Sequence, residues 1–383
     1  MRVLLIGGTG VLSTAVTHEA VTRGFSVTMI NRGRNVSQIP KEVELIKSDK
    51  DNIGYIAEKL FGREFDAVID FLCYNQQELE RSFKLYSNYT KQYFFISSAA
   101  VYNTSVQGPC KEDHPKVQAI WEYSVNKWSS EKKLMRLSEE IGVNYTIVRP
   151  MITYDDTRIP YGIAPYYGFH WTFVERILHN KPIILWNNGL NRCNMMRVED
   201  FAVGLVGLIG NKQAYNEAFN ICGDETPSYR EVMDIVGRQV NHLVKYIDVS
   251  PEFYAQEDPG HKGELLGGRA VDFIVDNSKL KGVVADFSQT IRIEDGVRMT
   301  LDAYRKKHYE KGISWIYDAD CDRIILKWCK QNHLNVKQYN LGFVDYWGTA
   351  TFKDKVMYFL RYKSDKFYVR IFTKILAKLR RFL

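Results

Sequence analysis

The feature that most constrains the fold is a glycine-rich turn between an apolar run and a stretch with helical periodicity. Gly7, Gly8 and Gly10 follow directly on the run Arg2–Ile6, and the helical stretch Leu12–Arg23 comes next. A strand that enters a helix through a turn almost free of side chains is typical of the first unit of a parallel α/β sheet. The chain is therefore expected to begin with a βαβ arrangement.

The same alternation continues through the first 150 residues. Short runs rich in β-branched or aromatic residues predict the strands Arg2–Ile6, Ser26–Asn31, Glu42–Lys47, Ala67–Phe71, Tyr93–Ser97 and Asn144–Arg149. Helical patterns between them predict the helices Leu12–Arg23, Asn52–Phe61, Gln76–Tyr86 and Trp121–Ile141. Strands that alternate with helices indicate an α/β fold: a Rossmann-type, doubly wound parallel sheet covered on both faces.

Three segments are expected along the chain. Residues 1–150 would form the Rossmann domain. Pro150 and Pro160 break the alternation, and residues 151–308 are expected to form a smaller C-terminal substrate lobe, with some pieces returning to the main sheet. Residues 309–383 would be an extra C-terminal appendix.

Composition excludes several classes of protein. Hydrophobic residues make up 45% of the chain and charged residues 25%, which is ordinary for a globular protein. The six cysteines form no CxxC pair, so neither a disulfide framework nor a metal site is expected. The apolar run before Gly7 is too short for a signal sequence, and no uncharged stretch is long enough to span a membrane. A cytoplasmic protein is expected.

The turn Gly7–Gly10 is a candidate site for a dinucleotide pyrophosphate. Glycines let the backbone approach phosphate oxygens, and the N-terminus of the following helix offers free N–H groups and a positive dipole. The spacing is G-x-x-G-x-x-S, with Ser13 at the third position, where a small side chain still permits close packing of helix and strand.

The residues after the second expected strand favour NADP(H) over NAD(H). An NAD-preferring domain carries an acidic residue there, which binds the ribose 2′-OH. Here the segment is Asn31-Arg32-Gly33-Arg34, and a guanidinium binds a 2′-phosphate where a carboxylate would repel it. The alternative is that the arginines are solvated loop residues. Asp49, after the third strand, could accept from the adenine amino group or could be a simple turn residue.

Tyr123 and Lys127 are candidate catalytic residues. They are four residues apart, so they share one face of the expected helix. A free tyrosine has a pKa of about 10 and is a poor base at neutral pH. A nearby ammonium favours the phenolate, which could then take a proton from a substrate hydroxyl.

The position of this pair supports the assignment, because Y-x-x-x-K alone arises often by chance. It follows the strand end Ser97-Ser98 and precedes Arg149-Pro150, and parallel strands end at one edge, where ligands bind. Ser98 is the expected hydroxyl that would bind the reacting oxygen beside Tyr123.

With these motifs in place, the chain resembles the NAD-dependent epimerase/dehydratase family, the extended short-chain dehydrogenases/reductases. The matching pieces are Gly7–Leu12, Ser97–Tyr102, Tyr123–Lys127 with Glu131, Arg149-Pro150 and Arg197–Asp200. Within the family it is similar to the branch of the chloroplast stem-loop-binding proteins and their bacterial relatives, through Asn31–Arg34, Phe65–Tyr74, Phe219–Glu225 and Val275–Lys281. The resemblance covers about residues 1–305.

The resemblance implies a bound NAD(P) and a nucleotide-sugar substrate. The cofactor contacts that it implies, together with those expected above, are Gly7, Thr9, Gly10, Val11, Leu12, Asn31, Arg32, Arg34, Asp49, Phe71, Leu72, Tyr123, Lys127 and Pro150. Two departures narrow the reaction. Ile152 stands where sugar-nucleotide epimerases of the family have an asparagine on the diphosphate. Ala99-Ala100 stand where the dehydratases have an acidic pair, which disfavours 4,6-dehydration.

Three hypotheses remain open. The first is a nucleotide-sugar epimerase or reductase, which we expect to act in polysaccharide biosynthesis and which could be a homodimer. The second is an NADP-dependent reductase of another carbonyl substrate. The third is a non-enzymatic RNA-binding or scaffold protein on the same fold, since fold does not determine function. Nucleic acid is not the expected partner, because residues 1–351 carry a net charge of only −1.

The C-terminal stretch is strongly basic. Residues 352–383 contain ten Lys or Arg against two Asp. In residues 366–383, apolar residues recur at helical spacing beside a separate stripe of cations. One interpretation is a helix on an anionic membrane surface, which would place the protein at the inner face of the membrane. The other is a C-terminal helix that packs its apolar face on the enzyme body.

Overall fold

The computed structural model describes residues 1–116, 120–369 and 371, which form two compact units. The first comprises Met1–Asp155, Arg192–Pro227 and Gly267–Ile293. The second comprises Asp156–Asn191, Ser228–Leu266 and the described residues from Glu294 onward. Each unit is therefore assembled from three separate stretches of chain, and the segment from residue 309 belongs to the second unit.

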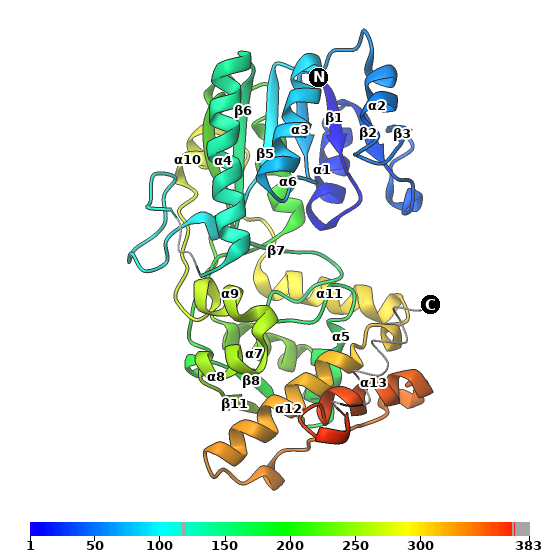
Figure 1. The fold of residues 1–383 in the computed structure, drawn as a ribbon, viewed down its shortest axis with the longest axis vertical. Coiled ribbons are helices and arrows are strands. Elements are labelled where there is room, and N and C mark those ends of the chain that lie inside the picture. Colours follow the sequence, from blue (N-terminus) through cyan, green and yellow to red (C-terminus); the bar gives the residue numbers. More distant parts are fainter. Residues whose placement is uncertain (117–119, 370, 372–383) are drawn as a thin grey trace. The chain divides into compact units, whose positions relative to one another are not determined.

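The first unit is built on a seven-stranded parallel sheet in the order β10-β6-β5-β4-β1-β2-β3 (Figure 1). These strands are β1 (Arg2–Ile6), β2 (Ser26–Asn31), β3 (Glu44–Lys47), β4 (Ala67–Asp70), β5 (Gln92–Ile96), β6 (Asn144–Pro150) and β10 (Glu217–Ile221). A separate parallel pair consists of β7 (Ile152–Tyr154) and β9 (Met195–Arg197). The doubly wound parallel sheet expected from the sequence is confirmed, and the stretch ending in β10 returns to its edge.

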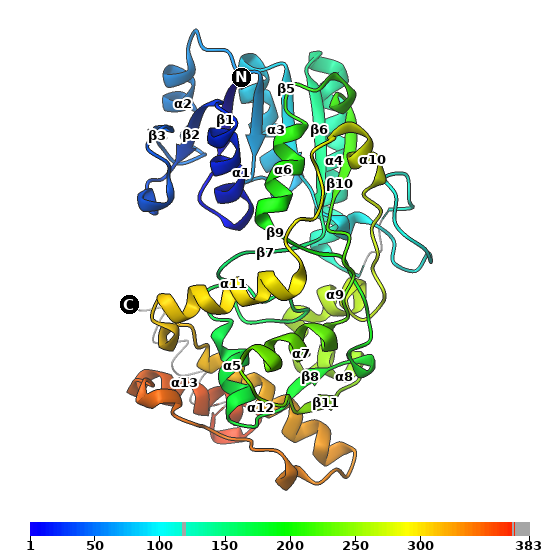
Figure 2. The same ribbon diagram turned by 180° about the vertical axis from the view of Figure 1, so that it is seen from behind.

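Helices cover both faces of this sheet, as the views from the two sides show (Figures 1 and 2). They are α1 (Val11–Thr22), α2 (Ile53–Leu60), α3 (Gln76–Tyr86), α4 (Glu122–Ile141), α6 (Val198–Gly207) and α10 (Ser278–Val283). Alternate strand residues serve opposite faces: Val3 and Leu5 pack with α1 and α6, whereas Leu4 and Ile6 pack with α2 and α3. This explains why the strands are apolar without a polar alternation.

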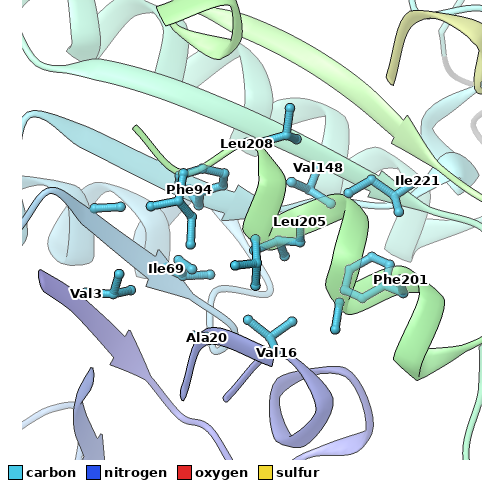
Figure 3. Packing of buried hydrophobic residues seen from close by; sticks show 14 of the residues in the cluster. Val3, Val16, Ala20, Ile69, Phe94, Val148, Phe201, Leu205, Leu208 and Ile221 are labelled. Carbon is cyan, nitrogen blue, oxygen red and sulfur yellow. The ribbon is translucent and has the colours of Figure 1, made fainter. Parts of the chain in front are cut away.

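The core beneath α6 illustrates the packing. Leu205 of α6 is fully buried in one cluster with Ile69 and Phe94 of the sheet (Figure 3). Burial of such a side chain contributes about 1.5–3 kcal/mol relative to leaving it in water. The central strands are therefore packed on both faces, and their carboxyl ends are fixed by the core beneath them.

The second unit is mainly helical. Its helices are α5 (Trp171–Leu178), α7 (Tyr229–Gln239), α8 (Pro251–Glu257), α9 (Lys262–Glu264), α11 (Ile293–Lys306), α12 (Trp315–Gln331) and α13 (Phe352–Tyr362). A two-stranded parallel sheet joins β8 (Ile183–Leu185) to β11 (Tyr246–Asp248). In Figures 1 and 2 the helices α12 and α13 lie side by side.

A buried cluster of charged side chains connects α12 to the rest of this unit. The Lys181 ammonium lies 2.7 Å from a carboxylate oxygen of Asp318 and 2.7 Å from one of Asp322. Arg176 of α5 pairs with the same two carboxylates. Because all four side chains are almost completely buried, their charges are compensated inside the unit rather than by water.

Among the described residues, no helix is both long and apolar enough to cross a membrane. All six cysteines are buried and none forms a disulfide. Of the basic stretch 366–383, residues 366–369 and 371 are described. The rest of the helix expected there lies outside the described residues.

Candidate active site

Lys127 lies on the buried face of α4, behind the carboxyl ends of β4 and β5. Its ammonium donates to the carbonyl oxygen of Cys73 at 2.7 Å and to that of Ile96 at 2.8 Å. The side chain is 4% exposed, and burial lowers its pKa to about 8. Two backbone carbonyls at the edge of the sheet thus hold the ammonium in place. Because burial disfavours its charged form, nearby charges influence its protonation strongly.

Tyr123 lies one turn before Lys127 on α4. Its ring centroid is 5.8 Å from the Lys127 ammonium and 5.2 Å from the ring of Trp121. Tyr123 is 36% exposed, whereas Lys127 beside it is almost completely buried. The two side chains therefore lie on the same face of α4, as their i, i+4 spacing predicted.

Ser98 lies at the end of β5, where it caps a short 3₁₀ turn, η3 (Ala99–Val101). Its hydroxyl accepts from the backbone N–H of Ala100 at 3.2 Å. The hydroxyl of Ser124, next to Tyr123 in α4, donates to the carbonyl oxygen of Ala100 at 2.5 Å. This bond ties the turn that carries Ser98 to the helix that carries Tyr123 and Lys127, so the structure brings all three expected residues to the same edge of the sheet.

A buried ion pair supports this arrangement, and sequence analysis did not assign it a role. Glu131, one turn after Lys127, receives 3.0 and 2.7 Å hydrogen bonds from the guanidinium of Arg149 on β6. It also accepts from the Ser97 hydroxyl at 2.5 Å. Although burial opposes it, the Glu131 carboxylate raises the pKa of Arg149. One carboxylate therefore connects α4 to the end of β5 and to β6. In the sequence, the i+4 spacing of Lys127 and Glu131 was the signal that could have indicated a role for Glu131.

The ion pair continues into a polar network behind η3. Arg149 also donates to the hydroxyl of Tyr102 at 2.9 Å, and that hydroxyl donates to the side-chain oxygen of Asn220 on β10 at 2.6 Å. Tyr102 is almost fully buried, and burial is the main reason that its pKa is raised. The network thus reaches from α4 across β6 to the edge strand β10.

The glycine-rich turn has the geometry required for a pyrophosphate cradle. Gly7 and Gly8 have φ values of 108° and 104°, which glycine adopts far more readily than residues with a side chain. A Cβ atom on Gly8 would come within 2.3 Å of the Met29 side chain. Val11 and Leu12 form the first turn of α1, whose N–H groups have no partners within the helix. These residues fit a dinucleotide phosphate.

Asn31 organises the same turn. Its side-chain amide donates to the carbonyl oxygen of Gly7 at 3.1 Å and to the hydroxyl of Thr9 at 3.0 Å. Its side-chain oxygen accepts from the N–H of Gly33 at 2.9 Å. Asn31 therefore connects the glycine-rich turn to the loop that carries Arg32 and Arg34.

Both arginines of that loop are exposed, and within the described residues neither has an acidic partner. Lys47 of β3 lies against the loop, because a Cβ on Gly33 would be 2.9 Å from the end of its aliphatic chain. The β2 end is thus surrounded by cations, one of which, Lys47, sequence analysis missed. Asp49 is exposed, and its carboxylate accepts from the N–H of Asp51 at 3.1 Å, the geometry of a turn residue.

Phe71 and Leu72 follow β4 and face the turn: atoms of both side chains lie 3.4–3.5 Å from where a Cβ on Gly7 would be. The preceding Asp70 is buried and holds this segment, with its carboxylate accepting from the N–H of Leu72 at 2.7 Å. Pro150 is the buried last residue of β6. The expected cofactor residues of the first unit therefore lie along the carboxyl edge of one sheet.

A family model and several known proteins match this chain. The family model described as "NAD dependent epimerase/dehydratase family" matches residues 3–222, which is more than half of the chain. The chloroplast stem-loop binding protein of 41 kDa b from Arabidopsis thaliana is 26% identical over 238 residues, 58% of this chain and 59% of that protein. A UDP-glucose 4-epimerase from Lactobacillus helveticus is 26% identical over 169 residues, 39% and 51% of the two chains. The chain thus spans little more than half the length of these curated relatives.

Solved structures show the same fold. The UDP-glucuronic acid 4-epimerase from Bacillus cereus, in complex with UDP-glucuronic acid and NAD, superimposes with a TM-score of 0.64. The similarity covers 80% of this chain and 99% of that one at 16% identity. At this identity the likeness establishes the architecture of the chain and nothing finer.

Proposed function

Because the chain belongs to the NAD-dependent epimerase/dehydratase family, we propose that it is an NAD(P)-dependent enzyme that epimerises or reduces a nucleotide sugar. The observation that carries the proposal is the contact between the accessible Tyr123 ring and the buried Lys127 ammonium, 5.8 Å apart beside Ser98. Relatives named for UDP-sugar epimerisation and a solved neighbour with UDP-glucuronic acid support the choice of substrate class.

The three residues divide the proton chemistry among them. Tyr123 takes the proton of a sugar hydroxyl when that carbon is oxidised, and returns it in the opposite direction. The Lys127 ammonium stabilises the phenolate, and its fixed carbonyl contacts keep it in place. The Ser98 hydroxyl binds the reacting oxygen. A bound nicotinamide supplies hydride transfer at the same carbon.

Dehydration is not proposed. Ala99 and Ala100, which stand where an acidic pair would assist loss of water, are both buried and have no ionisable group. Ile152 is a buried residue of β7 and offers no amide to a diphosphate. Typical epimerases of the family use an asparagine at this position, so here other residues would have to bind the diphosphate.

We further propose NADP(H) as the preferred cofactor. The support is the loop with Arg32 and Arg34, together with the neighbouring Lys47, at the end of β2. Three cations and no carboxylate at that position favour a 2′-phosphate over a free ribose hydroxyl pair.

The experiment is a product analysis. The purified full chain is incubated with UDP-, GDP- and dTDP-sugars, with NADP(H) or NAD(H), and sugar configuration is followed by proton NMR. We expect that at least one nucleotide sugar is converted to its epimer, or that the 4-keto form of at least one is reduced to the alcohol. Turnover only of a carbonyl compound that carries no nucleotide would move the assignment to a reductase of another class.

A further inference from the structure

The surface around α13 carries large apolar side chains that the fold leaves uncovered. Phe352, at the start of this helix, is 83% exposed, and Phe359 is exposed two turns later. Beyond the helix, Phe367 is 78% exposed, and Tyr368 and Ile371 are exposed as well. We refer to these five residues, Phe352, Phe359, Phe367, Tyr368 and Ile371, as the α13 patch.

Other residues of α13 pack inside the second unit. Tyr358 and Leu360 are buried, and the Tyr358 hydroxyl donates to Asp322 of α12 at 2.6 Å. Phe359 of α13 and Tyr368, which follows the helix, line one hollow together with Val356 and the buried Leu360. Two residues of the patch therefore lie together, and the hydrogen bond from α13 to α12 comes from Tyr358, which is not one of them.

Cations without an acidic partner occur in the same stretch of chain as the patch. Within the described residues, Lys353, Lys363 and Lys366 have no acidic partner, whereas Lys355 is paired with Asp345 at 2.9 Å. The Lys363 ammonium lies 4.9 Å from the centroid of the Phe359 ring. Residues 352–383 together hold ten Lys or Arg against two Asp, while residues 1–351 are close to neutral.

We propose that the α13 patch binds an anionic phospholipid surface. Aromatic rings enter the boundary between headgroups and acyl chains, and the long lysine stems keep their ammonium groups at the level of the phosphates. Anionic lipids attract each of these cations. A second copy of the chain fits less well, because it would bring an equally basic stretch against this one.

Sedimentation with vesicles tests the proposal. The full-length protein is mixed at low salt with vesicles of phosphatidylcholine alone, or with about one-third phosphatidylserine. We expect binding only to the anionic vesicles, and weaker binding as salt is added. The double variant Phe352→Ser/Phe367→Ser should lower the partition coefficient about tenfold or more, because both rings leave the contact. Phe61→Ser, on a residue that is 88% exposed in the first unit, is the matched control and should bind like the parent.

Thermal unfolding of both variants checks that they remain folded, since none of the three phenylalanines is buried. The proposal is wrong if the parent protein stays in the supernatant with anionic vesicles at low salt. It is equally wrong if the double variant sediments like the parent, or if neutral and anionic vesicles bind alike. Loss of a concentration-dependent dimer in the double variant, without vesicle binding by the parent, would instead assign the patch to contact between copies.

Discussion

In the proposed mechanism, the role of Lys127 depends directly on its burial. Its ammonium is almost completely enclosed, yet it lies against the accessible ring of Tyr123. Burial disfavours the charged form, so the pKa falls to about 8 and the residue is charged at neutral pH but loses its charge at moderately alkaline pH. The charge that would assist Tyr123 in the proposed mechanism is therefore lost as the pH rises through about 8.

An alkaline limb in the pH profile follows from this. We expect kcat/KM to fall as the pH rises through about 8, because a neutral amine no longer stabilises the Tyr123 phenolate. Lys127→Arg, whose side chain stays charged throughout this range, should lack the limb in whatever activity it retains. A limb at the same pH in both proteins would show that another group is titrating.

Glu131 is expected to act through position rather than by contact with substrate. Glu131→Gln removes the charge that compensates the buried Arg149, and loss of one partner of such a pair costs about 3–5 kcal/mol. Urea unfolding should show this loss. The control is Glu139→Gln, on an exposed residue of the same helix, which should change the free energy of unfolding by less than about 0.5 kcal/mol. Equal urea midpoints of unfolding for the two variants would show that Glu131 does not stabilise the site.

At the scale of elements, the sequence predicted the sheet well, because its strands are short apolar runs bounded by glycines and polar turns. Gln76–Tyr86 is the helix expected, and the bounds of the other predicted helices of the first 150 residues differ from the observed ones by at most one residue. Such helices and strands are determined by local periodicity. The contacts between them are not. Asn31 binds the turn at Gly7, and Glu131 binds Arg149, only once the sheet has brought distant segments together.

The loop after β2 determines the cofactor preference that we propose. Replacing Arg32 and Arg34 by alanine should weaken NADPH binding at least about tenfold, since one charge-assisted hydrogen bond contributes about 1.5–3 kcal/mol. NADH binding should change little. Arg136→Ala, on an exposed residue of α4, is the control and should leave both affinities unchanged. Isothermal titration of the two cofactors measures this, and equal parent affinities for NADPH and NADH would contradict the proposed preference.

For the whole molecule, the sequence indicated a sheet domain followed by later segments, but not how the chain is divided in space. Each unit takes three separate stretches. The stretch from residue 309 was expected as an appendix; it lies in the second unit, where Asp318 and Asp322 pair with Arg176 and Lys181. Nothing in local periodicity could reveal that pairing, because the partners are 137 or more residues apart.

The central claim is that Tyr123 is the acid–base group of a working enzyme. The most direct test compares Tyr123→Phe with the parent protein on the nucleotide sugar that the parent converts. Tyr55→Phe, on another exposed tyrosine of the first unit, is the control. We predict that Tyr123→Phe lowers kcat about 10²–10⁴-fold while its affinity for the cofactor and its thermal unfolding stay close to those of the parent. Turnover by Tyr123→Phe at the level of the parent and of Tyr55→Phe would contradict the account.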